Sequence, residues 1–189
     1  GSDGIHGEIL RFADAERGGF FFSGPRHDPL IARPKEYHDN SVPSGNSAAA
    51  TALARLGLLL QSGAWLASAE ATLRSALPLI ARAPAAAAQM LIVADLLTRP
   101  QHLVVLAMVA SDEAELRRRV QALQRRWLPD WHFVLRPASG AIPAELAELL
   151  GEKTVQNHQS ALYHCQGFTC AAPLVGRTAI ESFLASIEP

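Results

Sequence analysis

The stretch His102–Ala110, which reads HLVVLAMVA, decides the fold of the second half of this chain. After His102 it is an uninterrupted apolar run, bounded upstream by Pro100 and downstream by Ser111. A strand with one face in water alternates apolar and polar side chains, whereas a strand covered on both faces is apolar throughout. The run therefore predicts a buried central strand with other elements packed on both of its faces.

A helix pattern follows this run. Ser111 is expected to cap the helix, with Asp112 and Glu113 in its first turn. Arg125 and Arg126 fall in its last turn, and both charge placements suit the helix dipole. Its buried stripe is expected to contain Leu116, Val120, Leu123 and Trp127.

The rest of the chain keeps alternating between strand and helix patterns. The expected elements are a strand at 131–136, a short helix opened by Pro143 and closed by Gly151, a strand at 161–165, and a last helix with the capping box Thr178–Glu181. The order β-α-β-α-β-α predicts a small three-stranded parallel sheet with right-handed crossovers. We therefore expect a small α/β domain at 101–189.

Residues 1–99 carry mostly helical patterns. Helices are expected at 47–61, capped by Asn46 or Ser47, at 64–82, kinked or split by Pro78, and from Pro84 to Leu97. A short helix at 4–16 and a β-hairpin that pairs Phe20–Phe22 with Leu30–Arg33 are expected before them. Thr98-Arg99-Pro100 marks the domain boundary, so the predicted fold class is α+β in two parts, 1–99 and 101–189.

Composition excludes several classes of function. The 189 residues are 49% hydrophobic, enough for a sizeable core, and the formal charge of −1 gives no electrostatic case for nucleic acid or an anionic membrane. No apolar run approaches the roughly 20 residues of a membrane helix. Two cysteines are too few for a disulfide framework, so we expect a cytoplasmic protein. Dinucleotide and P-loop motifs are absent, and no cofactor is expected.

A polar loop at 33–47, RPKEYHDNSVPSGNS, precedes the first long helix. Helix N-termini offer free backbone N–H groups, so a polar loop aimed at one is suited to hold a polar ligand. The candidate ligand-binding residues are Lys35, His38, Asp39, Asn40, Ser44 and Asn46. Glu36 and Asp39 are weak candidates for a catalytic acid/base pair.

Structural roles compete with ligand binding at each of these positions. For Ser44, Asn46 and Ser47, turn formation and helix capping are the favoured interpretation. For Lys35 and Asp39 the two interpretations are balanced, and a buried ion pair between them would satisfy both.

Cys165 and Cys170 stand at the end of the last predicted strand. Two buried thiols that act as small hydrophobic side chains are the favoured interpretation, and a reversible disulfide is the alternative. Zinc would need about four ligands, and His164 and His158 are the only further ones nearby in sequence, so no metal site is expected.

Several sequence blocks occur in the order in which a known family carries them. The blocks are Gly18–Phe21, Arg33–Glu36, Asp39–Asn40, Pro43–Ser47, Tyr163–Cys165 and Cys170–Pro173. With them the chain resembles the C-terminal part of the spermatogenesis-associated protein 20 family. The resemblance spans nearly the whole chain. It implies a thioredoxin-like domain followed by a six-hairpin, glycosidase-like (α/α) toroid, of which residues 1–99 would be part. The chain has no Cys-x-x-Cys pair and is much shorter than such proteins, so we expect the C-terminal region of a larger protein.

The leading functional hypothesis is that this chain contributes one wall of a carbohydrate-type cleft and is not catalytic alone. A sugar or polyol is then the expected ligand. The alternative is a scaffold or interaction module that docks a thioredoxin-like domain or a partner subunit, and a weaker alternative is a thiol/disulfide redox unit. Helices that lack their toroid neighbours are expected to expose Leu53, Leu56, Leu73 and Leu77 and to drive self-association.

Overall fold

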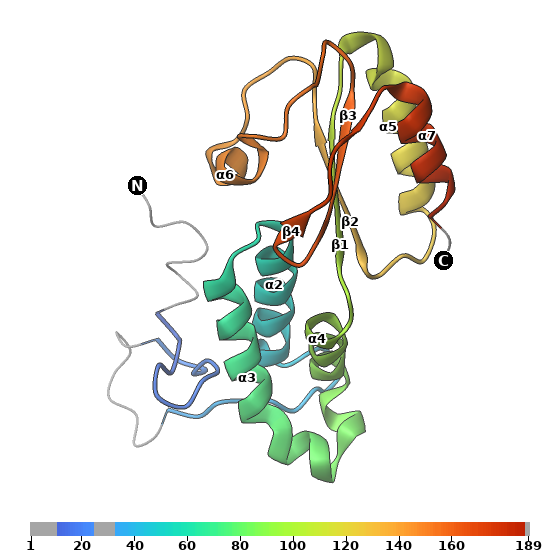
Figure 1. Ribbon diagram of the computed structural model, residues 1–189. Coiled ribbons are helices and arrows are strands. Elements are labelled where there is room, and N and C mark those ends of the chain that lie inside the picture. The colour runs from blue at the N-terminus through green and yellow to red at the C-terminus, as the bar shows by residue number, and fades with distance from the viewer. Residues whose placement is uncertain (1–10, 25–32, 188–189) are drawn as a thin grey trace. The chain divides into compact units, whose positions relative to one another are not determined.

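The computed structural model describes residues 11–24 and 33–187, and these divide into two compact units (Figure 1). The first unit contains the described residues up to Gly57 together with Ser62–Arg99, and the second contains Leu58–Gln61 and the described residues from Pro100 onward. The first is helical and the second combines helices with a mixed sheet, so the α+β prediction is confirmed. No helix in the described stretches has the length and apolar character that crossing a membrane requires.

The helices of the first unit lie close to their expected positions. They are α2 (Gly45–Leu59), α3 (Gly63–Arg82), η1 (Pro84–Ala87) and α4 (Ala88–Thr98). Pro78 lies inside α3 without splitting it, so the helix continues to Arg82. Pro84 opens the short 3₁₀ helix η1, as its fixed φ angle and missing N–H favour at a helix start.

Small residues pack the helices of the first unit tightly. A Cβ atom added at Gly57 would lie 2.9 Å from the Leu66 side chain, so α2 and α3 approach closely at this point. Leu53 is only 2% exposed, and the prediction of an exposed Leu53 is therefore wrong. Leu56 and Leu73 are half-buried, and Leu77 alone of the four leucines is exposed, at 50%.

The segment before the polar loop differs from its prediction. Residues 11–17 form turns rather than the end of a helix, and Ala13 makes an isolated antiparallel bridge with Phe20. The Phe22 N–H donates to the Pro34 carbonyl at 2.9 Å. Residues 4–10 of the expected helix, and Leu30, Ile31 and Ala32 of the expected hairpin, lie outside the described residues.

The second unit is built around the predicted central strand. Its elements are β1 (His102–Ala107), α5 (Ala110–Gln124), β2 (Trp131–Arg136), η2 (Ala144–Leu146), α6 (Ala147–Leu150), β3 (Ala161–Gln166), β4 (Thr169–Cys170), β5 (Leu174–Val175) and α7 (Arg177–Ala185). The strand order is β2-β1-β3-β4, and β5 also pairs with β3. β1 and β2 are parallel, as expected from the helix between them.

The prediction of a purely parallel three-stranded sheet is wrong, because β3 runs antiparallel to β1. The pairing places Ala161 opposite Ala107, so β3 begins where β1 ends. A parallel return would need a crossover that carries the chain back along the whole sheet. The connection from β2 to β3 contains only the short helices η2 and α6, and it does not make that return.

The apolar run of β1 is explained by its two covered faces. Val104 and Leu106 pack with the buried side chains of α5 and α7, while Leu103 and Val105 pack with Leu149 and other residues of the opposite face. Figure 1 shows α5 and α7 side by side on one face of the sheet and α6 on the other. The helices therefore cover both faces of β1, as the apolar run predicted.

Three details of the helix ends in the second unit differ from their predictions. α5 begins at Ala110, so Ser111 lies inside the helix and does not cap it. The N-cap residue is Val109, whose N–H donates to Ser160 Oγ. Thr178 lies inside α7, whose N-cap is Gly176, so the expected capping box does not form. Trp127 lies beyond the end of α5 and is 83% exposed rather than buried.

Candidate functional site

The polar loop is fastened to the preceding segment by Asn46. Its side-chain Oδ1 accepts a hydrogen bond from the Phe20 N–H at 2.6 Å, and its Nδ2 donates to the carbonyls of Phe20 and Glu36, both at 2.9 Å. Asn46 is 3% exposed. A buried amide with its bonds satisfied in this way holds two distant backbone segments in a fixed register.

Asp39 joins the loop to the start of α4. Its carboxylate accepts hydrogen bonds from the N–H groups of Ser44 at 2.9 Å and Gln89 at 2.8 Å, while its own N–H donates to Ala86 O at 2.7 Å. Gln89 is in the first turn of α4, which has no side-chain cap of its own, so Asp39 supplies the negative charge there. Partial burial opposes ionisation of Asp39, but these hydrogen bonds outweigh it and lower its pKa.

Lys35 is bound to the segment before the loop. Its Nζ lies 2.6 Å from Asp14 Oδ2 and donates to Gly18 O at 2.5 Å. The hydrogen bond from Lys35, followed by one from the Arg17 N–H, lowers the pKa of Asp14 to about 2. The Lys35–Asp39 ion pair, considered as one structural possibility, does not form, because each residue has other partners.

Ser44 caps α2. Its Oγ accepts from the Ser47 N–H at 3.1 Å and donates to Ser47 Oγ at 2.9 Å, the contact of an N-cap residue with the third residue of its helix. The prediction that Asn46 or Ser47 would cap this helix is wrong, since the helix begins at Gly45. The structural interpretation favoured for Ser44 and Asn46 agrees with these contacts.

A pocket of about 500 Å³ lies beside this loop. Its apolar lining comes mainly from Phe12, Phe20, Phe21, Phe22, Val42 and Pro43. Its polar lining includes the exposed side chains of Glu36, His38 and Asn40 and the buried ones of Ser44 and Asn46. Glu36 Oε1 accepts from the His38 N–H at 2.7 Å, which turns this carboxylate back toward its own loop.

The predicted site residues therefore fall into two groups. Lys35, Asp39, Ser44 and Asn46 are engaged in bonds that shape the loop, and Ser44 and Asn46 also belong to the pocket lining. His38 and Asn40 line the pocket together with Glu36 and are exposed. Lys35 and Asp39 do not line the pocket. The phenylalanine wall was missed by sequence reasoning, although three of its members are consecutive at 20–22.

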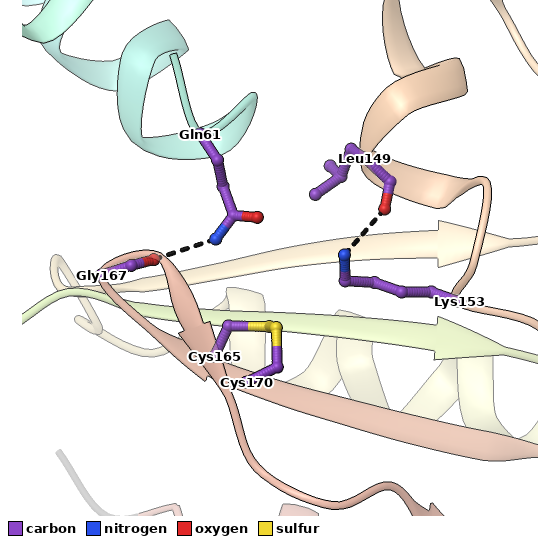
Figure 2. The surroundings of a disulfide bond; sticks show 6 residues. All are labelled: Gln61, Leu149, Lys153, Cys165, Gly167 and Cys170. Carbon is purple, nitrogen blue, oxygen red and sulfur yellow. Dashed lines mark hydrogen bonds between the residues drawn. A yellow bond between two sulfur atoms is a disulfide. The ribbon is translucent and has the colours of Figure 1, made fainter. Parts of the chain in front are cut away.

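The two cysteines form a disulfide (Figure 2). Cys165 on β3 and Cys170 on β4 are direct partners in the antiparallel register. Cys165 is completely buried, whereas Cys170 is exposed. The favoured interpretation of two buried free thiols is therefore wrong, and the disulfide alternative describes the pair.

Two histidines on neighbouring strands form a further polar pair in the second unit. His102 Nδ1 lies 2.9 Å from His164 Nε2, and the Trp131 ring stacks on His102 with centroids 4.2 Å apart. Burial lowers the pKa of both histidines, and each residue's pKa is further affected by a neighbouring charge: Asp130 raises that of His102, and His102 lowers that of His164. Nowhere in residues 11–24 and 33–187 do three His, Cys, Asp or Glu side chains gather to hold a metal ion.

The comparisons with known proteins add no relative. No protein-family model matches the chain, and none of the curated proteins matches it significantly. The resemblance to the spermatogenesis-associated protein 20 family therefore stays a prediction based on the sequence blocks given above.

Proposed function

We propose that the phenylalanine-walled pocket binds a sugar or polyol, as one wall of a carbohydrate-type cleft in a larger protein. The observation that carries this proposal is the combination of a phenylalanine-rich wall with the polar side chains of Glu36, His38 and Asn40 around one cavity of about 500 Å³. Small-molecule sites are concave and mostly apolar, with a few polar groups that fix orientation.

The chemistry of a sugar matches this lining. A pyranose presents C–H groups on its faces, which pack against aromatic rings, and hydroxyl groups around its edge, which need hydrogen-bonding partners. Phe21 and Phe22 offer rings, and Phe22 is 80% exposed. Asn40 and His38 offer both donors and acceptors to hydroxyl groups.

The bonds inside the loop support this role. Asn46 and Lys35 hold the loop to the segment before it, and Asp39 holds it to the start of α4, by buried or half-buried contacts. A loop that is already ordered loses little conformational entropy when a ligand binds. In this proposal, Lys35, Asp39 and Asn46 hold the loop in place, and His38 and Asn40 make the ligand contacts that the sequence predicted for them.

The proposal assigns no independent catalysis to this chain. Asp39 accepts two backbone hydrogen bonds and has a lowered pKa, so it is a poor proton donor. Among the described residues that line the pocket, Glu36 is the only carboxylate. Glycoside hydrolysis usually needs two carboxyl groups that flank the scissile bond.

Isothermal titration calorimetry of the full chain against hexoses, N-acetylhexosamines and linear polyols tests the proposal. Binding to at least one of these is expected, with Phe22→Ala and Asn40→Ala each weakening it by about tenfold. Phe168→Ala is the matched control, because Phe168 is also an exposed phenylalanine but belongs to the second unit. Absence of binding at millimolar concentrations, or equal effects of all three variants, would contradict the proposal.

The interaction-module alternative rests on the same wall. Phe22 and Val42, which line the pocket, are 80% and 70% exposed, and a partner's apolar side chains would fill the space between them. In that case Phe22→Ala would weaken a protein–protein complex measured by light scattering and would leave sugar titrations flat.

A further inference from the structure

We propose that Cys165–Cys170 is a redox-active disulfide that exchanges with an external dithiol, with Cys170 as the sulfur that is attacked. This site lies in the second unit and is independent of the pocket proposed above. The proposal rests on the unequal exposure of the two cysteines and on the short hairpin that joins them.

The two sulfur atoms differ in access. Cys165 is completely buried in the apolar cluster that also contains Leu149 and Tyr163. Cys170 is exposed and belongs to β4, a strand of only two residues at the end of the strand order. Because an exchange reaction requires a thiolate to reach one sulfur, the incoming thiolate attacks Cys170 and Cys165 leaves.

The hairpin holds the two cysteines together after the disulfide opens. Cys165 and Cys170 face each other in the register, and the Ala171 N–H donates to the His164 carbonyl at 2.9 Å just beyond them. At the tip, Gln61 Nε2 donates to the Gly167 carbonyl at 2.9 Å, within the same unit (Figure 2). These bonds do not depend on the disulfide, so the thiols stay opposite each other and can close again.

A positive charge lies in the surroundings of the pair. Lys153 Nζ donates to the Leu149 carbonyl at 2.9 Å, and Leu149 packs in the same cluster as Cys165. Figure 2 shows the Lys153 side chain in the surroundings of the disulfide. A nearby ammonium group favours the thiolate form of a leaving cysteine.

The exchange transfers two electrons from the external dithiol to the protein disulfide. A thiolate of the external dithiol attacks Cys170 Sγ, the Cys165–Cys170 bond breaks, and its electron pair leaves on Cys165 Sγ, which takes up a proton. The second thiol of the external dithiol then loses its proton and attacks the dithiol's other sulfur atom, which is bonded to Cys170 in the mixed disulfide. Cys170 is released as a thiolate, which is then protonated. The protein disulfide is thus reduced by two electrons and two protons, and the external dithiol is oxidised to a disulfide.

The first test uses the unaltered full chain and needs no variant. The chain is equilibrated without denaturant in mixtures of reduced and oxidised dithiothreitol, and its thiols are counted by alkylation and mass spectrometry. A reversible two-electron transition, with unchanged circular dichroism, is expected. Reduction that occurs only when denaturant unfolds the second unit would overturn the proposal.

The second test identifies the attacked sulfur. During partial reduction of the unaltered chain with glutathione, the mixed disulfide is expected on Cys170, and an adduct on Cys165 would contradict the proposal. Cys165→Ser, which keeps only Cys170, is expected to react with an aromatic disulfide reagent about tenfold faster than Cys170→Ser. Equal rates in the two folded variants would also overturn it.

Discussion

Gly18 is fixed as glycine by its conformation and by its neighbour. Its φ angle is +71°, a region that side-chain-bearing residues rarely adopt, and an added Cβ atom would lie 2.6 Å from the carbonyl oxygen of Ala71. That oxygen belongs to the backbone of α3, so it cannot move aside as the end of a flexible side chain would. The Gly18 carbonyl also accepts a hydrogen bond from Lys35 Nζ.

We predict that Gly18→Ala lowers the free energy of unfolding of the first unit by about 2–4 kcal/mol, from the left-handed backbone and the contact with α3. Gly63→Ala is the matched control, because nothing lies within 4 Å of its added Cβ and its φ angle is ordinary. Amide hydrogen exchange of α2 and α3 measures both. Similar protection in the two variants would show that the contact with α3 is not constraining.

A second prediction at this scale concerns the ion pair of Lys35 and Asp14. The pKa of Asp14 is lowered from 3.8 to about 2, so its contribution to stability is present above pH 3.8 and is lost as the pH falls toward 2. Lys35→Met is expected to return the Asp14 pKa toward 3.8 in a carboxyl NMR titration. Arg33→Met, which removes the other cation near the Phe21 ring, is expected to leave it low. A low pKa in the absence of Lys35 would assign the shift to the backbone hydrogen bonds instead.

At the scale of the elements, local patterns located most helices and strands but not how they pair. The apolar run at 102–110 predicted a strand covered on both faces, and β1 has that environment. The direction of β3 depends on where the connection after β2 returns, and no periodicity within β3 encodes that. Likewise, Asn46 bonds to Phe20, which lies 26 residues earlier in the sequence. The composition of the polar loop alone could therefore not separate the residues that shape the loop from those that only line the pocket.

The histidine pair shows the same limit and leads to a prediction for β1 and β3. Sequence reasoning treated His102 and His164 separately, whereas the register brings them onto one face, beside Trp131. Burial lowers the pKa of both, so the unfolded chain binds protons more readily than the folded one. The stability that the pair provides is complete above the ordinary histidine pKa of 6.5 and falls as the pH drops below it.

We therefore expect the second unit to lose stability as the pH falls below 6.5, and the double variant His102→Phe/His164→Phe to show a weaker dependence. Urea unfolding followed by tryptophan fluorescence measures this, since Trp131 stacks on His102. His158→Asn is the control, because His158 is exposed and its φ angle of 60° is one that asparagine tolerates. An unchanged pH dependence in the double variant would assign it to other groups.

At the scale of the whole molecule, self-association through helix faces stays a prediction, with a changed set of residues. Leu53 is buried and takes no part, whereas Leu77 on α3 and Leu91 and Ile92 on α4 are 50%, 40% and 44% exposed. We expect concentration-dependent association in light scattering, reduced by Leu77→Glu. Trp127→Glu, at an exposed apolar side chain outside both helices, is the control. A monomer at high protein concentration would contradict the expectation that these helices lack neighbours.

The most direct test of the central claim is an NMR titration of the full chain with the tightest-binding sugar or polyol. Because the pocket is lined by Phe20–Phe22 and by Glu36, His38 and Asn40, the account predicts saturable shifts in the amides of 20–22 and 36–42. The hairpin at 166–170, in the second unit, is expected to stay unchanged. Shifts that are absent at saturation in 20–22 and 36–42, or that concentrate in the second unit, would contradict it.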